Sequence, residues 1–367
     1  MKFSCLANDL ATALQNTARV VAIRSSLSAV GGILLETTED HVSLVGYNFD
    51  IAITAKIPAK IETPGRIVLG AKLLTDIMRH IPEGVVTAEV NDLHFKITNN
   101  NLKFDIIGIN AQEYPELPDV ASQTEVILPA EKFKDLVNKT VYAASTDETK
   151  LTYTGALLKI EKEQMTIVAL DGFRLAKKTE IVNTKETISV ICPSRSLQEV
   201  ARLISHSNQE VFINIATNII MFRIGDYKVI SKLLEGTFLD YGATIPEEFG
   251  THVVANTENL INCVERTSIV VQDKLKAPIL LNVSTASICL NCEGPTGCAS
   301  DELPCSVHGA ELKIGFNSRL LLDALRACGT NEVSLKFSGN LSPVIIESAD
   351  ESNNFLFLVL PIRTESD

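Results

Sequence analysis

The spacing of hydrophobic and polar positions predicts helices and strands that alternate in a fixed order along the chain. Apolar residues three and four positions apart predict amphipathic helices. Some of these helices open each third of the chain, over Asp9–Ala22, Ala130–Ala144 and Thr257–Val270. Others lie in the middle of each third, over Ala71–Ile81, Ser194–Ser205 and Asn317–Cys328. Short alternating runs rich in β-branched residues predict strands around them, as at Glu89–Ile97 and Val211–Ile215.

One layout of strands recurs three times. An apolar run opens each copy, at Gly32–Leu35, Gly155–Leu158 and Pro278–Leu281, so the period is 123 residues. A unit of this length can bury a core of its own, which distinguishes it from a turn of a solenoid. We therefore predict an α+β fold of three repeated domains, each with antiparallel sheets and two helices. The predicted domains are residues 1–122, 123–248 and 249–367.

Composition places the chain among ordinary globular proteins. It has 46% hydrophobic and 21% charged residues. No apolar run approaches the ~18 to 20 residues that a membrane helix needs. Asp9 comes too early for a signal peptide, so we predict a cytoplasmic protein. In a reducing cytoplasm the eight cysteines are expected to act as small apolar residues.

Basic residues are concentrated on the predicted helices. The net charge of the chain is −12, which weighs against nucleic-acid binding by the whole surface, yet the helices carry eleven Lys and Arg against eight Asp and Glu. Four basic pairs are spaced by seven residues, about two helical turns, so each pair projects from one face. They are Lys72 with Arg79, Lys132 with Lys139, Arg195 with Arg202, and Arg319 with Arg326. Such faces either keep the helices soluble or meet phosphates without reading sequence.

Four segments resemble a known family. Leu170–Ala176 reads Leu-Asp-Gly-Phe-Arg-Leu-Ala and is similar to the T-D-G-H-R-L-A signature of bacterial beta clamps, the sliding clamps of the replicative polymerase. Ser231–Tyr241 resembles their S-K-L-(I/V)-(D/E)-G-x-(F/Y)-P-(D/N)-Y, and Val359–Arg363 resembles V-(M/L)-P-(M/I)-R. Ile314–Asn317 matches a further segment. The motifs follow the family's order and span essentially the whole chain.

The resemblance implies a non-catalytic binding protein that works as a ring. Two chains would associate head to tail, which places six domains around a hole lined by helices, with the sheets outside. Duplex DNA would pass through the hole without being read in sequence, which fits the basic helix pairs. The ring would hold the replicative polymerase and the clamp loader through short hydrophobic peptides. The resemblance implies no cofactor, no metal and no membrane.

The family's functional positions carry over to this chain as three groups. The partner-peptide pocket would comprise Tyr153, Leu170, Gly172, Phe173, Arg174, Leu175, Leu239, Thr244, Leu275, Asn317, Leu320, Leu358, Val359, Leu360, Pro361, Ile362 and Arg363. Leucine and isoleucine would bury apolar anchors of the peptide, while arginine and asparagine would fix its polar groups. The DNA-facing surface would add Arg24 to the four basic pairs. The dimer contact would join Phe104 and Ile106 to Ile269 and Val270 of the second chain.

Four departures from the family pattern stand out. Leu239 replaces the family's proline, and Leu170 replaces its common threonine. Leu27–Val30 reads Leu-Ser-Ala-Val instead of Leu-Pro-Ile-Leu, and Thr364–Asp367 extends the chain beyond the final arginine. These changes bear on the shape of the pocket and its peptide preference more than on the fold.

Two other classes of function remain as alternatives. The spacing of Cys289, Cys292, Cys298 and Cys305 could suggest a zinc site or a thiol enzyme. The repeat places Cys289 and Cys292 on one strand, where an odd separation points them to opposite faces and disfavours chelation. The phosphate-binding, serine-hydrolase and zinc-protease motifs are missing from the sequence. The second alternative is a DNA-binding module that does not encircle DNA, which a monomer in solution would favour.

Overall fold

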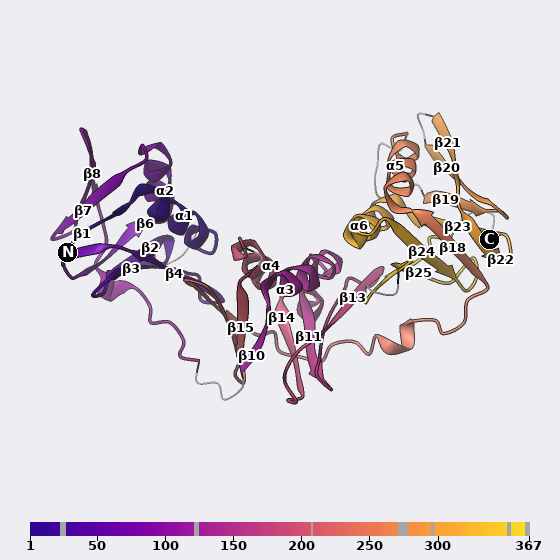
Figure 1. Cartoon of the computed structure of the whole chain (residues 1–367), viewed down its shortest axis with the longest axis horizontal. Helices are drawn as coiled ribbons and strands as arrows, with labels where there is room; N and C mark the ends of the chain where they lie inside the picture. The colour runs from indigo at the N-terminus through magenta and orange to yellow at the C-terminus, as the bar shows by residue number, and fades with distance from the viewer. Residues whose placement is uncertain are drawn as a thin grey trace. The chain divides into compact units, whose positions relative to one another are not determined.

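The structure, a computed structural model, describes residues 1–22, 27–120, 125–206, 208–270, 278–294, 297–350 and 354–363. Three features predicted from the sequence lie outside these ranges, namely Arg24, Leu275 and the extension Thr364–Asp367. The chain forms two compact units, one of residues 1–131 and 202–233 and the other of residues 132–201 and 234–367 (Figure 1). Each unit holds two sheets whose strands pair antiparallel.

The predicted helices are all present within the described residues. They are α1 (Ala7–Ala18), α2 (Ala71–His80), α3 (Ala130–Asn138), α4 (Ser194–Leu203), α5 (Thr257–Ser268) and α6 (Ser318–Cys328). The helix that opens each repeat ends earlier than predicted. Near each of these ends a buried threonine, Thr17, Thr140 or Thr267, donates its hydroxyl to the carbonyl four residues back, a bond that competes with the helical ladder. No helix in the described ranges is long and apolar enough to cross a membrane.

The first unit contains a five-stranded and an eight-stranded sheet. The smaller runs β5-β1-β7-β8-β9, from β1 (Lys2–Leu6), β5 (Lys60–Thr63), β7 (Val85–Asn91), β8 (His94–Asn99) and β9 (Leu102–Ile107). The larger runs β10-β15-β16-β17-β4-β3-β2-β6, from β2 (Gly32–Thr37), β3 (His41–Tyr47), β4 (Ile51–Pro58), β6 (Arg66–Gly70), β10 (Glu125–Pro129), β15 (Glu210–Ile215), β16 (Ile219–Ile224) and β17 (Tyr227–Lys232). Leu10 and Leu14 of α1 share one buried core with Phe3, Phe95 and Leu44 from the two sheets.

One predicted strand proves to be a hairpin. The run Glu89–Ile97 spans the end of β7 at Asn91 and the start of β8 at His94. Asp92 between them has a φ of +53°, a left-handed conformation that aspartate tolerates better than most residues. The turn at Asp92 and Leu93 therefore outweighs the alternation of apolar positions around it.

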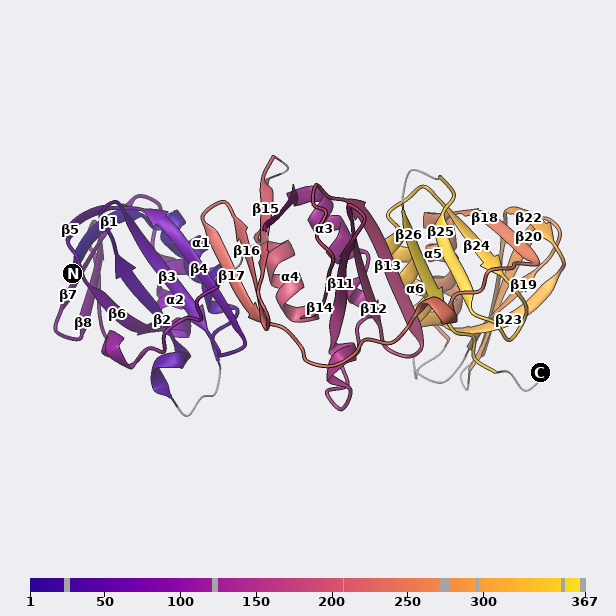
Figure 2. The ribbon, with the colours of Figure 1, turned by 90° about the horizontal axis from the view of Figure 1, so that it is seen from below.

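The second unit contains a nine-stranded and a four-stranded sheet. The larger runs β14-β11-β12-β13-β26-β25-β24-β18-β22, from β11 (Gly155–Glu161), β12 (Gln164–Leu170), β13 (Arg174–Ile181), β14 (Ile188–Pro193), β18 (Thr251–Asn256), β22 (Ser306–Gly309), β24 (Glu332–Phe337), β25 (Val344–Ser348) and β26 (Phe355–Val359). The smaller runs β21-β20-β19-β23, from β19 (Pro278–Val283), β20 (Ser287–Gly294), β21 (Gly297–Pro304) and β23 (Leu312–Asn317). Figure 2 shows β13, β26, β25 and β24 side by side.

The repeat seen in the sequence is a repeat of strand pairing. In each copy the strand that opens the pattern lies between its hairpin partner and the strand that leads into the second helix: β2 between β3 and β6, β11 between β12 and β14, and β19 between β20 and β23. The α+β fold with three repeats is therefore confirmed. The middle and last repeats share a sheet, because β13 pairs with β26 and sets Leu175 opposite Leu358.

Candidate functional site

A small cavity lies where the β12–β13 hairpin meets the chain around β26. Its volume is about 100 Å³. It is lined by Leu170, Gly172, Phe173, Arg174, Leu175, Leu239, Thr244, Leu358 and Leu360. Every one of these residues belongs to the pocket group that the family resemblance implied, although they come from separate stretches of the chain. The fold thus brings these residues together around one cavity.

The turn between β12 and β13 is fixed by Asp171 and by its own backbone. The Oδ1 atom of Asp171 accepts hydrogen bonds from the backbone N–H groups of Phe173, at 2.8 Å, and Arg174, at 3.0 Å. Gly172 has a φ of +93°, which residues with a Cβ rarely adopt. The backbone N–H of Leu360 donates to the carbonyl of Phe173 at 2.9 Å. The backbone that presents the Phe173 ring is therefore held from both sides.

The cavity has a buried leucine floor and an exposed apolar rim. Leu170 and Leu358 of the floor belong to a buried hydrophobic cluster. At the opening, the exposed fractions are 65% for Phe173, 43% for Leu239 and 38% for Leu360. Covering such side chains with an apolar ligand stabilises a complex by roughly 1 to 2 kcal/mol each. A cluster of this kind marks a place for an apolar partner rather than for a charged small molecule.

Arg174 lines the cavity as predicted, but its guanidinium is paired inside the protein. Its Nε donates to Oδ2 of Asp171 at 3.0 Å, and its Nη1 donates to Oδ2 of Asp323 at 2.7 Å. The guanidinium lies over the Tyr142 ring, 5.4 Å from its centre, a cation–π distance. Burial raises the pKa of the Tyr142 hydroxyl well above its ordinary value. The guanidinium of Arg174 therefore belongs to an ion network within the chain, while the role predicted for it, to fix polar groups of a peptide, stays a prediction.

Asp323 and Tyr142, which bind Arg174, are not among the residues predicted for the pocket. Asp323 lies on α6 and Tyr142 in a short 3-10 helix, Val141–Ala143, both remote in sequence from the Asp171–Arg174 turn. The available signal was the position of Asp323 between the basic residues Arg319 and Arg326 on one predicted helix. That position alone suggests a solvated helix face, so Asp323 could not be assigned to the pocket from its place in the sequence.

Among the described residues, the other predicted pocket members do not belong to the lining of the cavity. Tyr153 packs against Phe238, with ring centres 6.4 Å apart, in the cluster beneath the floor. The side chain of Asn317 caps α6, because its Oδ1 accepts from the backbone N–H groups of Arg319 and Leu320. Val359 is buried, whereas Leu320, Pro361 and Ile362 are half-buried and Arg363 is exposed.

Most of the paired basic residues on the helices are exposed. They are Lys72, Arg79, Lys132, Arg195, Arg202, Arg319 and Arg326. Arg79 pairs with Asp76 at 3.6 Å, Lys132 with Glu180 at 3.4 Å, and Arg326 with Glu265 at 2.7 Å. Exposed ion pairs of this kind contribute about 0 to 1 kcal/mol. Their basic groups can therefore exchange a carboxylate for a phosphate at little cost.

Lys139 is the exception, and its predicted place on a DNA-facing surface is wrong. Its side chain is buried, with 8% of the residue exposed, because α3 ends at Asn138 and the chain turns inward. Its Nζ lies 3.1 Å from Oδ1 of Asp135 and 5.2 Å from the centre of the Phe355 ring. Asp135 also binds the buried amine of Lys178 at 2.8 Å. Lys139 therefore belongs to an internal ion cluster.

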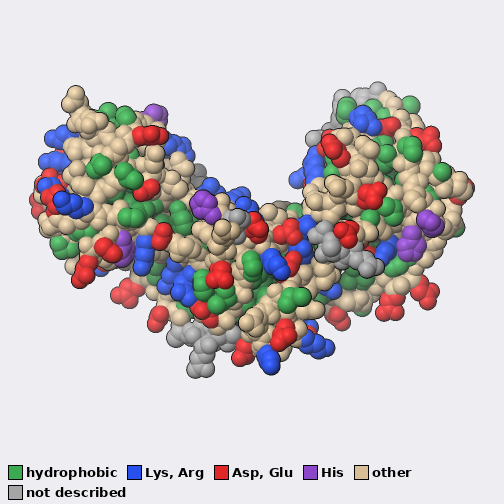
Figure 3. Space-filling model, in the orientation of Figure 1, with side chains coloured by type: hydrophobic (Ala, Val, Ile, Leu, Met, Phe, Trp, Pro, Cys, Tyr) green, Lys and Arg blue, Asp and Glu red, His purple; other side chains and the backbone are tan. Residues whose placement is uncertain are grey.

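A larger groove lies between α5 and α6. Its volume is about 710 Å³, and it is lined by Glu265, Ser268, Ile269, Ser318, Arg319, Leu322, Asp323 and Arg326. Figure 3 shows basic and acidic side chains beside one another over these two helices. The groove therefore differs from the apolar cavity in being lined mainly by polar and charged groups.

The residues predicted for the dimer contact lie at or near sheet edges. β9 is an edge strand of its sheet, and its Phe104 and Ile106 are half-buried against the core of the first unit. In the second unit β21 is an edge strand, and Ile269, directly after α5, is highly exposed while Val270 is half-buried. Exposed sheet edges of this kind favour pairing with another chain.

Five of the eight cysteines are buried as packing residues, whereas Cys289 and Cys305 are half-buried and Cys298 is exposed. Cys289 and Cys292 lie on β20 and face opposite sides of the strand, with Cys292 at a buried position and Cys289 half-buried. Burial raises the pKa of the Cys263 thiol and of the Cys328 thiol to about 12, so both are protonated at neutral pH. In the part of the chain that the structure describes, no three His, Cys, Asp or Glu side chains are grouped to hold a metal ion.

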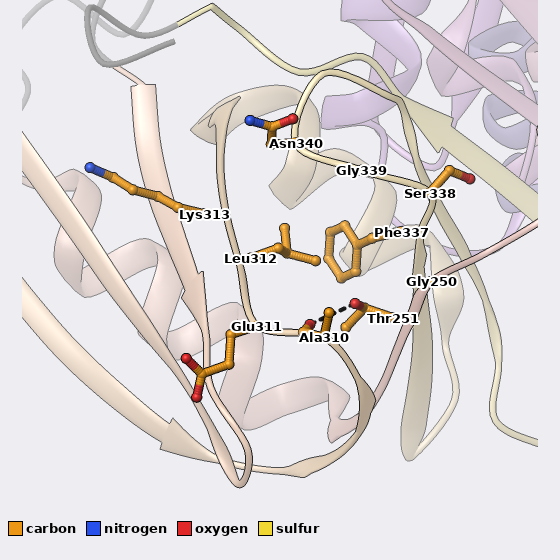
Figure 4. A pocket seen from close by; sticks show the side chains of 10 residues that line it. All are labelled: Gly250, Thr251, Ala310, Glu311, Leu312, Lys313, Phe337, Ser338, Gly339 and Asn340. Atoms are coloured by element: carbon orange, nitrogen blue, oxygen red, sulfur yellow. Dashed lines mark hydrogen bonds between the residues drawn. The ribbon is translucent and has the colours of Figure 1, made fainter.

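A further cavity, of about 470 Å³, opens beside the start of β18 and the end of β24 (Figure 4). The hydroxyl of Thr251 in its wall donates a hydrogen bond to the carbonyl of Ala310 at 2.7 Å. Figure 4 shows the charged ends of Glu311 and Lys313 directed away from each other, so these groups do not converge on a ligand. The cavity at the β12–β13 turn is the better candidate because its exposed apolar side chains converge.

Comparison with known proteins gives one consistent result. Family models of the DNA polymerase III beta subunit match residues 1–118 (N-terminal domain), 127–240 (central domain) and 243–363 (C-terminal domain). The beta sliding clamp of Bacillus subtilis is 28% identical over 378 residues, covering 99% of this chain and 100% of the relative. The crystal structure of the Bacillus subtilis DNA polymerase sliding clamp aligns with a TM-score of 0.94 at 28% identity, covering 99% of each chain. A Pseudomonas aeruginosa sliding clamp bound to griselimycin aligns with a TM-score of 0.94 at 25% identity, covering 99% of this chain and 100% of that one.

Proposed function

Since this chain belongs to the family of DNA polymerase III beta subunits, the bacterial sliding clamps, we propose that the cavity at the β12–β13 turn is where it holds its protein partners. A sliding clamp is a non-catalytic ring that encircles duplex DNA and tethers the replicative polymerase, and that is the function of this chain. The partners that we assign to the cavity are short hydrophobic peptides of the polymerase and of the clamp loader.

The observation that carries this proposal is the exposed apolar rim of Phe173, Leu239 and Leu360 above a leucine floor. A globular protein keeps such side chains in water at a cost unless a partner covers them. The turn that presents Phe173 donates a backbone hydrogen bond to Asp171 and accepts one from Leu360, so little conformational entropy is lost when a peptide docks. Leu239 and Leu170, which depart from the family pattern, make the cavity more apolar.

We assign the DNA contact to the exposed basic residues of the helices, including Arg195, Arg202, Arg319 and Arg326. A surface that meets phosphates through long, exposed side chains and offers no fixed base contacts lets the protein move along DNA. For ring closure we keep the edge residues Phe104 and Ile106 against Ile269 and Val270 of the partner subunit. We also keep the domain boundaries after residues 122 and 248 and a cytoplasmic location as parts of the proposal.

The pocket is tested by titrating a fluorescent peptide, Gln-Leu-Ser-Leu-Phe, with the wild-type protein and with the variant Leu360→Ala. We expect saturable binding by the wild type and a loss of about tenfold in the variant, because a rim side chain is truncated. Leu341→Ala is the matched control, since Leu341 is also an exposed leucine of the second unit but does not line the cavity. Equal losses in both variants, or no binding by the wild type, would refute the assignment of the pocket.

A further inference from the structure

A single carboxylate on α6 lies between the pocket and the α5–α6 groove. Asp323 lines the groove, four residues after Arg319 and three before Arg326. Its Oδ2 also accepts the 2.7 Å hydrogen bond from Nη1 of Arg174, which lines the pocket. Arg174 lies in the region matched by the central-domain model and Asp323 in the region matched by the C-terminal model. The ion pair therefore joins two domains at the edge of the pocket.

The guanidinium of Arg174 is held on several sides. Asp171 binds it through Oδ2, while Oδ1 of the same carboxylate holds the backbone of the turn. Tyr142 supports its face, and the Tyr142 ring in turn meets the Phe357 ring edge-on, with centres 5.6 Å apart. Charge-assisted hydrogen bonds at these distances are stronger than neutral ones and fix direction as well as distance. A change at Asp323 can thus reach the turn through Arg174 and Asp171.

We propose that Asp323 is a positioning residue for partner-peptide binding. It fixes the guanidinium of Arg174 against Asp171, and this arrangement keeps the β12–β13 turn, with the exposed Phe173 ring, in the shape that a peptide fills. The inference rests on the proposed function of the pocket. It adds that the pocket is completed by α6, a helix that also carries the exposed Arg319 and Arg326.

The arrangement also has a consequence for ligand choice. The guanidinium of Arg174 already has two carboxylate partners, and 12% of its side chain is exposed. An acidic group in a peptide would have to displace Asp171 or Asp323 to reach it. We therefore assign selectivity to the apolar anchors of the peptide, and the network around Arg174 serves to hold the wall that they contact.

The first test is the variant Asp323→Asn, which keeps the volume of the side chain and removes its charge. We expect the affinity for the Gln-Leu-Ser-Leu-Phe peptide to fall about fivefold, as is typical when one member of a coupled network is lost. Glu347→Gln is the matched control: the Glu347 side chain is 27% exposed against 29% for Asp323, and it pairs with Lys336 away from the turn. This control should bind the peptide as the wild type does.

A double-mutant cycle separates positioning from a general loss of stability. If Asp323 acts through Arg174, Asp323→Asn should have no further effect on peptide affinity in an Arg174→Gln background. NMR titration at high peptide concentration measures the weak binding of these variants. Asp323→Glu, which keeps the charge, should recover most of the affinity lost in Asp323→Asn.

The outcomes separate this inference from its premise. Absence of binding by the wild type would remove the proposed pocket and the role of Asp323 with it. Normal binding by the wild type, combined with affinity within about twofold of it in Asp323→Asn, would overturn the positioning role alone. Losses that add up in the double variant would also overturn it, because they would show that Asp323 acts independently of Arg174.

Discussion

The apolar pocket and the α5–α6 groove are linked by Asp323, which lines the groove and binds Arg174 of the pocket, but they have opposite surface chemistry. In the pocket the side chains at the opening are apolar, and the one guanidinium is enclosed by Asp171, Asp323 and Tyr142. In the groove the charged groups are exposed, as in the pair of Arg326 with Glu265. The wall of the pocket is held by internal hydrogen bonds, whereas the charged groups of the groove are exposed to solvent.

This difference agrees with the two kinds of contact that we propose for this clamp. A protein partner has to stay bound, which favours a preformed apolar pocket with few internal motions. DNA has to pass, which favours exposed charges whose contacts form and break without a large change in free energy. If the comparison is correct, changes in the basic helices should affect DNA but not peptide, and changes in the pocket should do the reverse.

The largest effect is expected from reversing two charges on α4. Arg195→Glu with Arg202→Glu should lower retention on circular DNA by about thirtyfold at low salt and much less at high salt, because phosphate attraction becomes repulsion. Peptide affinity should stay at the wild-type level. Lys60→Glu with Lys313→Glu, which reverses two exposed lysines on strands, is the control for net charge. Equal loss of retention in the control would show that the helices are not the DNA path.

A smaller effect is expected from replacing Lys139, which should lower stability, whereas replacing Lys132 should affect DNA retention. Lys139→Met removes one member of a buried ion cluster, and we expect it to lower the free energy of unfolding by about 1.5 kcal/mol, a value moderated by the exposure of Asp135. Lys132→Met, at an exposed position, should leave stability unchanged and weaken DNA retention slightly. Urea unfolding and DNA retention measured on both variants test this. A stable Lys139→Met variant with weakened DNA retention would reverse our placement of Lys139.

The smallest effect concerns the backbone of the pocket turn. Gly172→Ala places a Cβ at a φ of +93°, where no neighbour lies within 4 Å, so the cost is backbone strain of about 1 to 2 kcal/mol. Gly329→Ala, at a φ of +61° with equally open surroundings, should cost a similar amount. Peptide affinity should fall about threefold in Gly172→Ala and stay unchanged in Gly329→Ala, because the first alone reshapes the rim. Thermal unfolding should therefore show similar losses of stability in the two variants, whereas peptide titration should show a loss of affinity in Gly172→Ala alone.

The sequence was sufficient for the fold because its signal is repeated. Each helix and each opening strand is predicted three times at corresponding places, so a local error is outweighed by the other copies. The bounds of individual strands and helices were predicted less well, because they depend on the side chains at turns and helix ends. Asp92 divides one predicted strand into a hairpin, and the back-bonded threonines Thr17, Thr140 and Thr267 accompany early helix ends. Both are side-chain effects on one or two residues, which hydrophobic periodicity does not register.

The residues of the candidate site were also predictable only in part. The apolar lining was predictable because the motifs around Leu170 and Leu360 are contiguous in sequence and match a family. Asp323 was not predictable, since its partner Arg174 lies 149 positions earlier and the pairing depends on how two domains meet. The prediction for Lys139 was wrong because of a local feature. A seven-residue spacing implies a shared face only while the helix continues, and α3 ends one residue before Lys139.

The order in which the chain is made has a consequence for the pocket. β26, residues 355–359, occupies an interior position of its nine-stranded sheet, between β13 and β25. On a ribosome that has not yet released these residues, β13 and β25 have no strand between them, and neither Leu358 nor Leu360 is in place. At about 5 to 20 residues per second, most of the chain emerges well before this strand. A chain in which β26 has not yet emerged therefore lacks one wall of the proposed pocket, so the surface that would bind a partner peptide forms only after this strand is made.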